Sequence, residues 1–193
     1  SLEGAQADQS ESIASLGPLY MMALFVIYAL LAIPLRAYLL PLIIMSVIPF
    51  AFVGAIWGHL IMKTFGYVSG LAMMSILGVV AASGVVVNSS LVLVHSVNNR
   101  INDGESILDA LIHASVSRCR PIILTSITTF VGLSPLMLNK SVQAQFLVPM
   151  AISLAFGVMF ATVVTLFVVP AAYLILDDLK RFFSRSPAVE AKP

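Results

Sequence analysis

The stretch Met21–Ile33, MMALFVIYALLAI, decides the fold class, because it is an unbroken apolar run. It lies within 24 residues that contain no Asp, Glu, Lys or Arg, between Glu11 and Arg36. A helix needs roughly 20 apolar residues to cross about 30 Å of hydrocarbon, whereas a membrane β-barrel shows ~10-residue segments of alternating polarity. The run therefore predicts a transmembrane helix and an all-α integral membrane protein.

The composition supports the same class. Of the 193 residues, 60% are hydrophobic and 10% are charged, whereas a soluble domain is about 45–50% apolar and about 25% charged. So few charges cannot cover the surface of a soluble enzyme, and the composition also excludes a disordered chain. The net charge of +1 argues against nucleic acid as a partner. The single cysteine, Cys119, can form no disulfide within the chain.

Four more gaps without charged residues follow, of 26, 36, 19 and 36 residues. Each holds one crossing, and neither longer gap comfortably holds two crossings and a turn. We therefore predict five spans, at about 16–35, 41–62, 69–97, 121–138 and 146–176. Pro34 and Pro41 bracket the first turn, which makes the first two spans antiparallel neighbours.

The basic residues predict the orientation. An odd number of spans places the termini on opposite sides, and Lys63 and Lys140 then lie on one side. The other side holds eight bases, which are Arg36, Arg100, Arg118, Arg120, Lys180, Arg181, Arg185 and Lys192. The positive-inside rule assigns the eight to the cytoplasm. The acidic tail 1–15 then lies outside the cell membrane and the tail 179–193 lies in the cytoplasm.

Residues 102–117 predict a short amphipathic helix at the cytoplasmic surface. Its apolar residues Ile107, Leu108, Leu111 and Ile112 fall on one helical face. Asp103 is the expected N-cap. The polar, proline-flanked tail 184–193 is expected to be disordered.

Small residues at four-residue spacing predict close helix packing in three spans. They are Gly54 and Gly58 in the second span, Gly78 and Ala82 in the third, and Ser153, Gly157, Ala161 and Thr165 in the fifth. Plain packing explains them, and sliding surfaces in a moving transporter are the alternative.

The third span, which also contains Ser83, is the most polar. Asn88 and His95 share one of its faces, and Ser89 and Ser96 repeat their spacing beside them. Such residues in a membrane face the bundle interior or a cavity. They either form interhelical hydrogen bonds or line a path for protons or water. His95 lies near the cytoplasmic end, where it could also sit at the interface. In the fourth span, Thr125 and Thr129 share a face with Gly132.

The five spans contain no Asp or Glu, so any titrating carboxylate of a proton-driven device is expected elsewhere. The sequence shows no metal-ligand cluster, phosphate loop or nucleophile motif. We therefore predict no metal, no cofactor and no enzyme. The chain begins with Ser1, after which an acidic tail precedes the first span. This start is expected of a piece of a longer membrane protein.

Four stretches resemble the C-terminal membrane half of resistance-nodulation-division (RND) efflux permeases, of the acriflavine-resistance-protein-B-like family. They are IYALLAIP with PLIIM (27–34 and 41–45), GVVVNSSLVLV (84–94), RCRPIILT (118–125), and QAQFL through AFG (143–157). They agree with the family in order and spacing, and the resemblance runs from about residue 4 to residue 178.

The resemblance implies a fold and an activity. Such permeases have twelve membrane helices in two similar halves, with two large periplasmic loops, and form trimers in the inner membrane of Gram-negative bacteria. They exchange protons for substrates, which pass through a periplasmic adaptor to an outer-membrane channel. This chain would supply the last five helices. The other partners would be seven helices and the periplasmic domains of the same permease, and the lipid bilayer.

The resemblance also implies a proton relay. In the family, two aspartates of the fourth helix meet a lysine of the tenth and an arginine and a threonine of the next. The arginine falls on Arg118 and the threonine on Thr125, but the lysine position is Val87. Relatives that share the Val-Val-Asn pattern often follow it with Asp, where this chain has Ser89. A variant relay would use Asn88, Ser89, Arg118 and bound water.

Two other functions remain open from the sequence. Related proteins with similar helices assist protein translocation or move lipids. A non-transporting remnant or assembly subunit would explain why the third span lacks Lys and Asp.

Overall fold

The structure, a computed structural model, describes all residues except 1, 36, 67–72, 140, 142 and 185–193. For residues 2–16 and 180–184 it describes the backbone alone. The described chain is helical and contains no strand. Its elements are α1 (Leu2–Leu35), α2 (Leu40–Met45), α3 (Ile48–Thr64), α4 (Met73–Asn102), α5 (Ile107–Met137), the 3-10 helix η1 (Ala144–Phe146) and α6 (Val148–Ser184). Five apolar segments are long enough to cross a membrane. The predicted all-α fold is confirmed.

The second apolar segment is interrupted. It comprises α2 and α3, with a turn at Ser46 and Val47. Pro49, at the start of α3, has no N–H to donate to the Met45 carbonyl, so the helical ladder cannot continue there. At the turn, Ser46 Oγ donates to the Ile43 carbonyl at 2.7 Å. The sequence pattern predicted a single uninterrupted span over 41–62.

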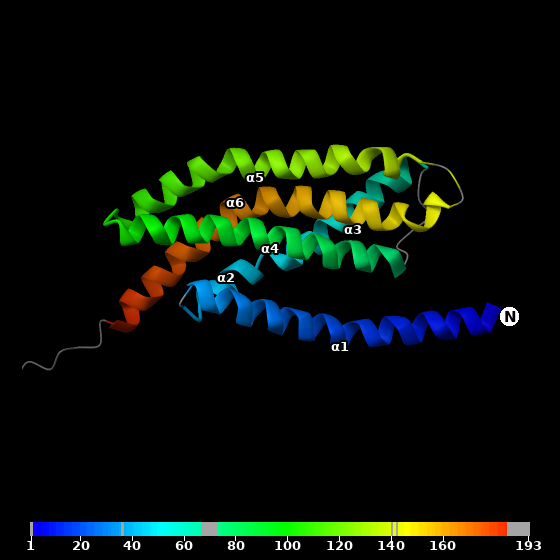
Figure 1. The fold of residues 1–193 in the computed structure, drawn as a ribbon, viewed down its shortest axis with the longest axis horizontal. Coiled ribbons are helices and arrows are strands. Elements are labelled where there is room, and N and C mark those ends of the chain that lie inside the picture. Colours follow the sequence, from blue (N-terminus) through cyan, green and yellow to red (C-terminus); the bar gives the residue numbers. More distant parts are fainter. Residues whose placement is uncertain (1, 36, 67–72, 140, 142, 185–193) are drawn as a thin grey trace, which may run out of the picture.

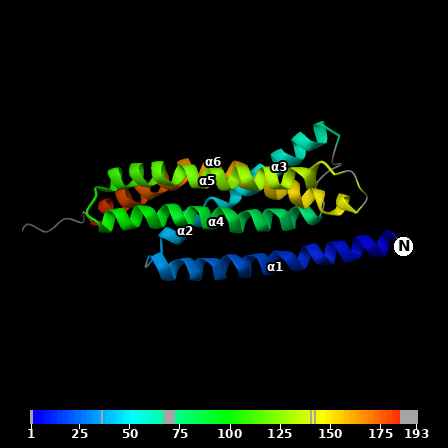
Figure 2. The same cartoon turned by 45° about the horizontal axis from the view of Figure 1, so that its top comes forward.

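Helix α1 lies at the edge of the bundle (Figures 1 and 2). It is helical from Leu2, so residues expected to be a tail belong to the same long helix as the apolar part, Gly17–Leu35. Only 11% of that apolar part is buried. Tyr20 OH lies 3.3 Å from Ser83 Oγ of α4. An apolar groove of about 310 Å³ separates α1 from α3 and α4 near Phe52.

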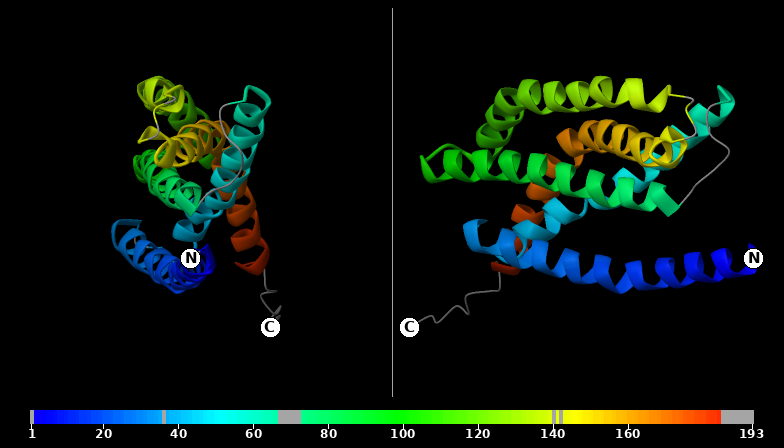
Figure 3. Two further views of the ribbon diagram at one scale, coloured as in Figure 1. Left: turned by 90° about the vertical axis from the view of Figure 1, so that its right-hand side faces the viewer. Right: turned by 45° about the vertical axis from the view of Figure 1, so that its right-hand side comes forward.

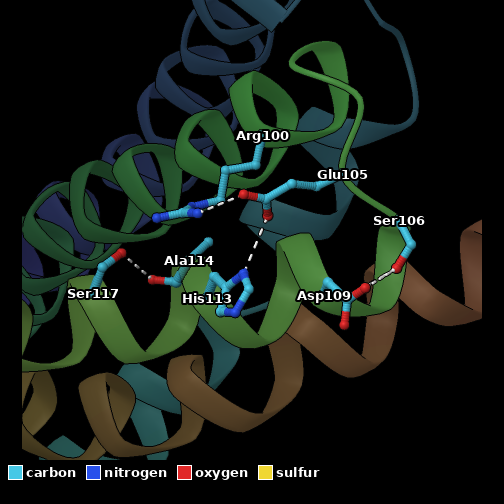
Figure 4. Close-up of polar contacts among 7 residues, drawn as sticks. All are labelled: Arg100, Glu105, Ser106, Asp109, His113, Ala114 and Ser117. Carbon is cyan, nitrogen blue, oxygen red and sulfur yellow. Dashed lines mark hydrogen bonds and ion pairs between the residues drawn. The ribbon is translucent and has the colours of Figure 1, made fainter.

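A tight turn joins α4 to α5. Gly104, with φ of 92°, ends α4, and the N–H groups of Gly104 and Glu105 donate to the carbonyls of Ile101 and Arg100. This is the glycine-terminated arrangement common at helix ends. Arg100 forms an ion pair with Glu105 at 2.9 Å, across the turn (Figure 4).

The N-cap of α5 is Ser106, whose Oγ accepts from the Asp109 N–H at 3.2 Å. The same hydroxyl donates to Asp109 Oδ2 at 2.6 Å (Figure 4). The prediction that Asp103 caps this helix is wrong, because Asp103 lies in the turn. The predicted surface helix 102–117 is the first part of α5, which continues through Pro121 to Met137. Figure 3 shows that α5 bends along its length, as a helix does where a proline removes a hydrogen bond.

Helix α6 is the centre of the bundle and packs against α3, α4 and α5 (Figure 3). Glycines permit this close approach. A Cβ atom on Gly54 would lie 2.6 Å from Phe160 Cβ, and one on Gly58 would lie 2.5 Å from Phe156 Cβ. On α4, a Cβ on Gly78 would meet the Met150 carbonyl oxygen.

Other small residues that the sequence predicted to pack closely also lie where α6 contacts α3 and α4. A Cβ on Gly157 would lie 3.1 Å from the Ala51 carbonyl oxygen and 3.2 Å from Ala82 Cβ. Ala82, Ser153 and Ala161 are fully buried. Small side chains thus line α6 where α3 and α4 cross it.

Candidate polar faces of α4 and α5

One face of α4 is exposed along its whole length, although it contains polar residues. The face follows a helical spacing and consists of Ala81, Gly84, Asn88, Val92, His95 and Asn99. His95 Nε2 lies 3.4 Å from Asn99 Nδ2. Within the described part of the chain, Asn88 has no hydrogen-bond partner. Asn88 and His95 therefore point away from the other helices of the bundle.

The neighbouring candidates of α4 are more buried than Asn88. Ser89 is half-buried and donates to the Val85 carbonyl at 3.2 Å. Ser83 is buried and donates to the Val79 carbonyl at 2.9 Å. Val87, at the lysine position of the resemblance, is 6% exposed and belongs to the hydrophobic core. A core-facing position explains why an apolar side chain is accommodated there.

Helix α5 has a similar exposed face. It consists of Arg118, Pro121, Thr125, Thr128, Gly132 and Pro135, spaced alternately by three and four residues. Thr125 Oγ1 donates to the Pro121 carbonyl at 2.8 Å, and the half-buried Thr129 donates to the Thr125 carbonyl at 2.8 Å. Arg118 forms no ion pair with another residue of the described ranges. Its guanidinium, always charged, is available to a partner.

Glycines distinguish these faces from the packed contacts. A Cβ atom on Gly84 or Gly132 would meet nothing within 4 Å, unlike Gly54, Gly58, Gly78 and Gly157. Among the described residues, no hydrogen bond joins the relay candidates to one another. Ser89 and Thr125 donate to backbone carbonyls of their own helices, and Asn88 and Arg118 are exposed.

Two buried polar contacts tie α6 to its neighbours. The sequence pattern did not indicate which residues form them. Ser126 Oγ of α5 and Thr162 Oγ1 of α6 lie 2.6 Å apart. His59 Nε2 of α3 and Ser153 Oγ of α6 lie 2.9 Å apart. Residue types alone could not reveal either pair, because each joins helices that are distant in sequence.

The two exposed faces offer a permanent cation, an amide and hydroxyl groups, but no acid. The described residues contain no group of three or more His, Cys, Asp or Glu that could hold a metal ion. Within the described ranges, these faces carry no carboxylate of their own. They can bind and orient a carboxylate or a water chain supplied by another helix.

This arrangement defines a class of protein. It is a multi-pass helical membrane protein in which two neighbouring helices carry faces of polar and small residues. The model of the AcrB/AcrD/AcrF family matches residues 1–177. The chain therefore belongs to this family, as its motifs indicated for an RND permease.

Similar proteins support the assignment. The chain is 30% identical over 190 residues to the swarming motility protein SwrC of Bacillus subtilis (strain 168), covering 97% of this chain and 17% of that protein. It is 30% identical over 173 residues to the multidrug resistance protein MdtC of Yersinia pseudotuberculosis serotype O:1b (strain IP 31758), covering 89% of this chain and 16% of MdtC. The chain thus spans about a sixth of the length of these relatives.

A solved structure shares the fold. The crystal structure of a heavy metal efflux pump superimposes with a TM-score of 0.78 at 23% identity, over 89% of this chain and 17% of the pump chain. At this identity the likeness concerns the arrangement of the helices.

Proposed function

We propose that this chain is part of a proton-driven RND-type efflux transporter that exports small amphiphilic or toxic compounds across the bacterial inner membrane. Its part in that activity is to contribute α4 and α5 to the proton-translocating helix bundle. Family membership and the MdtC relative support an efflux transporter. The polar faces of α4 and α5 support a role in proton movement.

The observation that carries this proposal is the exposure of Asn88, Arg118 and Thr125 on helices long enough to span a membrane. An arginine or amide that faced hydrocarbon would be costly, so intramembrane polar residues meet other polar groups or water. Gly84 and Gly132 leave room on the same faces for another helix. We infer that helices bearing carboxylates cover these faces in the whole transporter.

Each candidate then has a distinct role. Arg118 stabilises a partner carboxylate in its ionised form and releases it when that carboxylate is protonated. Asn88, Ser89 and Thr125 orient the carboxylates and the water molecules between them. His95 and Thr129 line the same path, whereas Ser83, predicted to do so, is buried on the side of α4 that also carries Val87. Val87 takes no part, since it packs in the core, so the cation on this side of the relay is Arg118 alone.

The orientation and partners belong to the same proposal. The N-terminus is periplasmic and the C-terminus cytoplasmic, because Arg100 lies in the last turn of α4 and Lys63 lies in the last turn of α3, at the opposite end of the bundle. The transporter contains seven further helices and periplasmic domains, forms a homotrimer, and delivers substrate through an adaptor to an outer-membrane channel. The residues before Gly17 connect to the periplasmic part.

The exchange of Arg118 for Ala in the full-length protein tests this role, with Arg120→Ala as the matched control. Loss of one charge-assisted hydrogen bond costs about 1.5–3 kcal/mol. Because 1.4 kcal/mol is tenfold in rate, export driven by a pH gradient in proteoliposomes is expected to fall about tenfold or more for Arg118→Ala. Equal rates for the two variants would remove Arg118 from the relay.

A further inference from the structure

His59 is a buried titratable residue outside the polar faces of α4 and α5. It lies on α3, is 6% exposed, and is hydrogen-bonded through Nε2 to the fully buried Ser153 of α6 at 2.9 Å. Its other ring nitrogen, Nδ1, is buried and has no hydrogen-bond partner among the described residues. A buried polar atom without a partner costs about 1–3 kcal/mol.

The surroundings of His59 are apolar and tightly packed. The adjacent Gly58 is in direct contact with the Phe156 side chain. The parts of α4, α5 and α6 at this end of the bundle, 73–82, 130–137 and 148–160, contain no Asp, Glu, Lys, Arg or His. On α3 itself, Lys63 lies one turn further on and is exposed. Among the described residues, the hydroxyl of Ser153 is hydrogen-bonded to the ring through Nε2, and the Pro149 carbonyl of the same helix lies near the ring without meeting Nδ1 in hydrogen-bond geometry.

A purely structural role does not account for this residue. One hydroxyl or amide would suffice to tie α3 to α6, as Ser126 and Thr162 tie α5 to α6 at 2.6 Å. An imidazole adds a second nitrogen, which in this packing lowers stability rather than raising it. A buried polar atom left without a partner is the kind of feature that marks a functional group.

We propose that His59 is a proton-binding site whose protonation is coupled to the packing of α3 against α6. The proposal rests on the proposed function for its direction, since the end of α3 and the start of α6 are then the periplasmic ends. His59 lies five residues before the end of α3, and Ser153 five residues after the start of α6. Protons driven inward by the proton motive force would arrive from the periplasmic side.

The proton step is simple. In the neutral tautomer that the proposal requires, Nε2–H donates to Ser153 Oγ and Nδ1 carries a lone pair. A proton from periplasmic water adds to Nδ1 and produces an imidazolium with two N–H donors and one positive charge. Charge in an apolar, tightly packed site is unfavourable unless it is hydrated or paired. The protonated state therefore favours separation of the outer ends of α3 and α6, and release of the proton restores their contact.

The titration itself is measured without transport. The full-length protein, labelled with ¹⁵N-histidine in lipid nanodiscs, is studied by solid-state NMR from about pH 8 to about pH 5, the range in which histidine ordinarily changes charge. The His59 signal is identified by its loss in His59→Gln. We expect its ring nitrogens to change from the neutral to the imidazolium pattern. A neutral pattern throughout the range in which the protein stays folded would overturn the proposal.

Coupling is tested by export from proteoliposomes at different external pH. His59→Gln keeps a hydrogen-bonding group beside Ser153 but cannot titrate, and His113→Gln, at an exposed histidine, is the control. The ratio of export rates at about pH 5.5 and about pH 7.5 is expected to move away from the wild-type value in His59→Gln and to stay at the wild-type value in the control. An unchanged ratio in His59→Gln would overturn the proposal.

A second variant covers the case in which His59→Gln fails to fold. Ser153→Ala removes the hydroxyl and keeps the imidazole, so the NMR transition should persist at a shifted pH. An unshifted transition would show that the α3–α6 contact is not coupled to the proton, and would overturn the proposal. Absence of pH-driven export in the wild-type protein would instead contradict the proposed function, because the NMR titration does not depend on transport.

Discussion

Asn88 and Val87 are adjacent in sequence but have opposite environments. Asn88 is exposed on α4, whereas Val87 packs in the core. The sequence identified Asn88 as polar and Val87 as a departure from a family pattern, but periodicity alone could not decide which face met the other four spans. That depends on the position of α6, which is set by glycine contacts between residues distant in sequence.

Thr125 and Thr64 allow a matched test at the residue scale. Both are exposed, and both Oγ1 atoms donate to the carbonyl four residues earlier, at 2.8 Å and 3.0 Å. Replacement by Val removes only the hydroxyl. We expect Thr125→Val to lower proton-driven export and Thr64→Val to leave it unchanged, because only Thr125 lies on the proposed relay face. Equal export by the two variants in proteoliposomes would exclude Thr125 from the relay.

At the scale of elements, the positions of the apolar segments follow from charge spacing, whereas their ends and breaks do not. Pro49 interrupts the second segment, but Pro121 bends α5 without ending it. The difference is not encoded in the proline alone. Ser106 supplies a cap that begins α5 well before Pro121, and Ala110, Leu111 and Ala114 bury the first turns against the core.

Gly58 and Gly17 provide a matched pair for the packing of α3 against α6. A Cβ on Gly58 would lie 2.5 Å from Phe156 Cβ, whereas one on Gly17 would meet nothing within 4 Å. Overpacking of a close contact costs about 1–3 kcal/mol, so Gly58→Ala should lower the free energy of unfolding by about that amount.

Gly17→Ala should leave the stability unchanged or raise it slightly, because alanine favours helix. The measurement is reversible unfolding of the full-length protein in mixed detergent micelles. Equal stabilities for the two alanine variants would show that α3 and α6 are not in close contact at Gly58.

At the scale of the whole molecule, α6 lies at the centre and α1 at the edge (Figure 1). The spacing of the charged residues predicted the number of membrane-spanning helices and which helix ends lie on the same side. Both follow from the order of the apolar segments along the chain. It could not predict that the last helix is central, since every span is apolar enough for any place in the bundle. The small residues of α6 were the available signal.

The orientation is tested by cysteine labelling in cells, in a background where Cys119 is replaced by Ser. Phe65→Cys lies just beyond α3, and Ser106→Cys lies in the α4–α5 turn. A membrane-impermeant maleimide that has entered the periplasm should label Phe65→Cys and leave Ser106→Cys unlabelled until the inner membrane is permeabilised. Labelling of Ser106→Cys in intact spheroplasts would reverse the proposed orientation.

Proton movement itself is the sharpest test of the proposal that this chain belongs to the proton-translocating part of an exporter. The full-length protein is reconstituted in vesicles that contain a pH-sensitive dye, and a transported compound is added in the absence of any imposed gradient. We expect export of the compound to move protons in the opposite direction in the wild-type protein, and Arg118→Ala to lower this proton movement about tenfold or more. Export that proceeds without any change in pH would contradict the proposal.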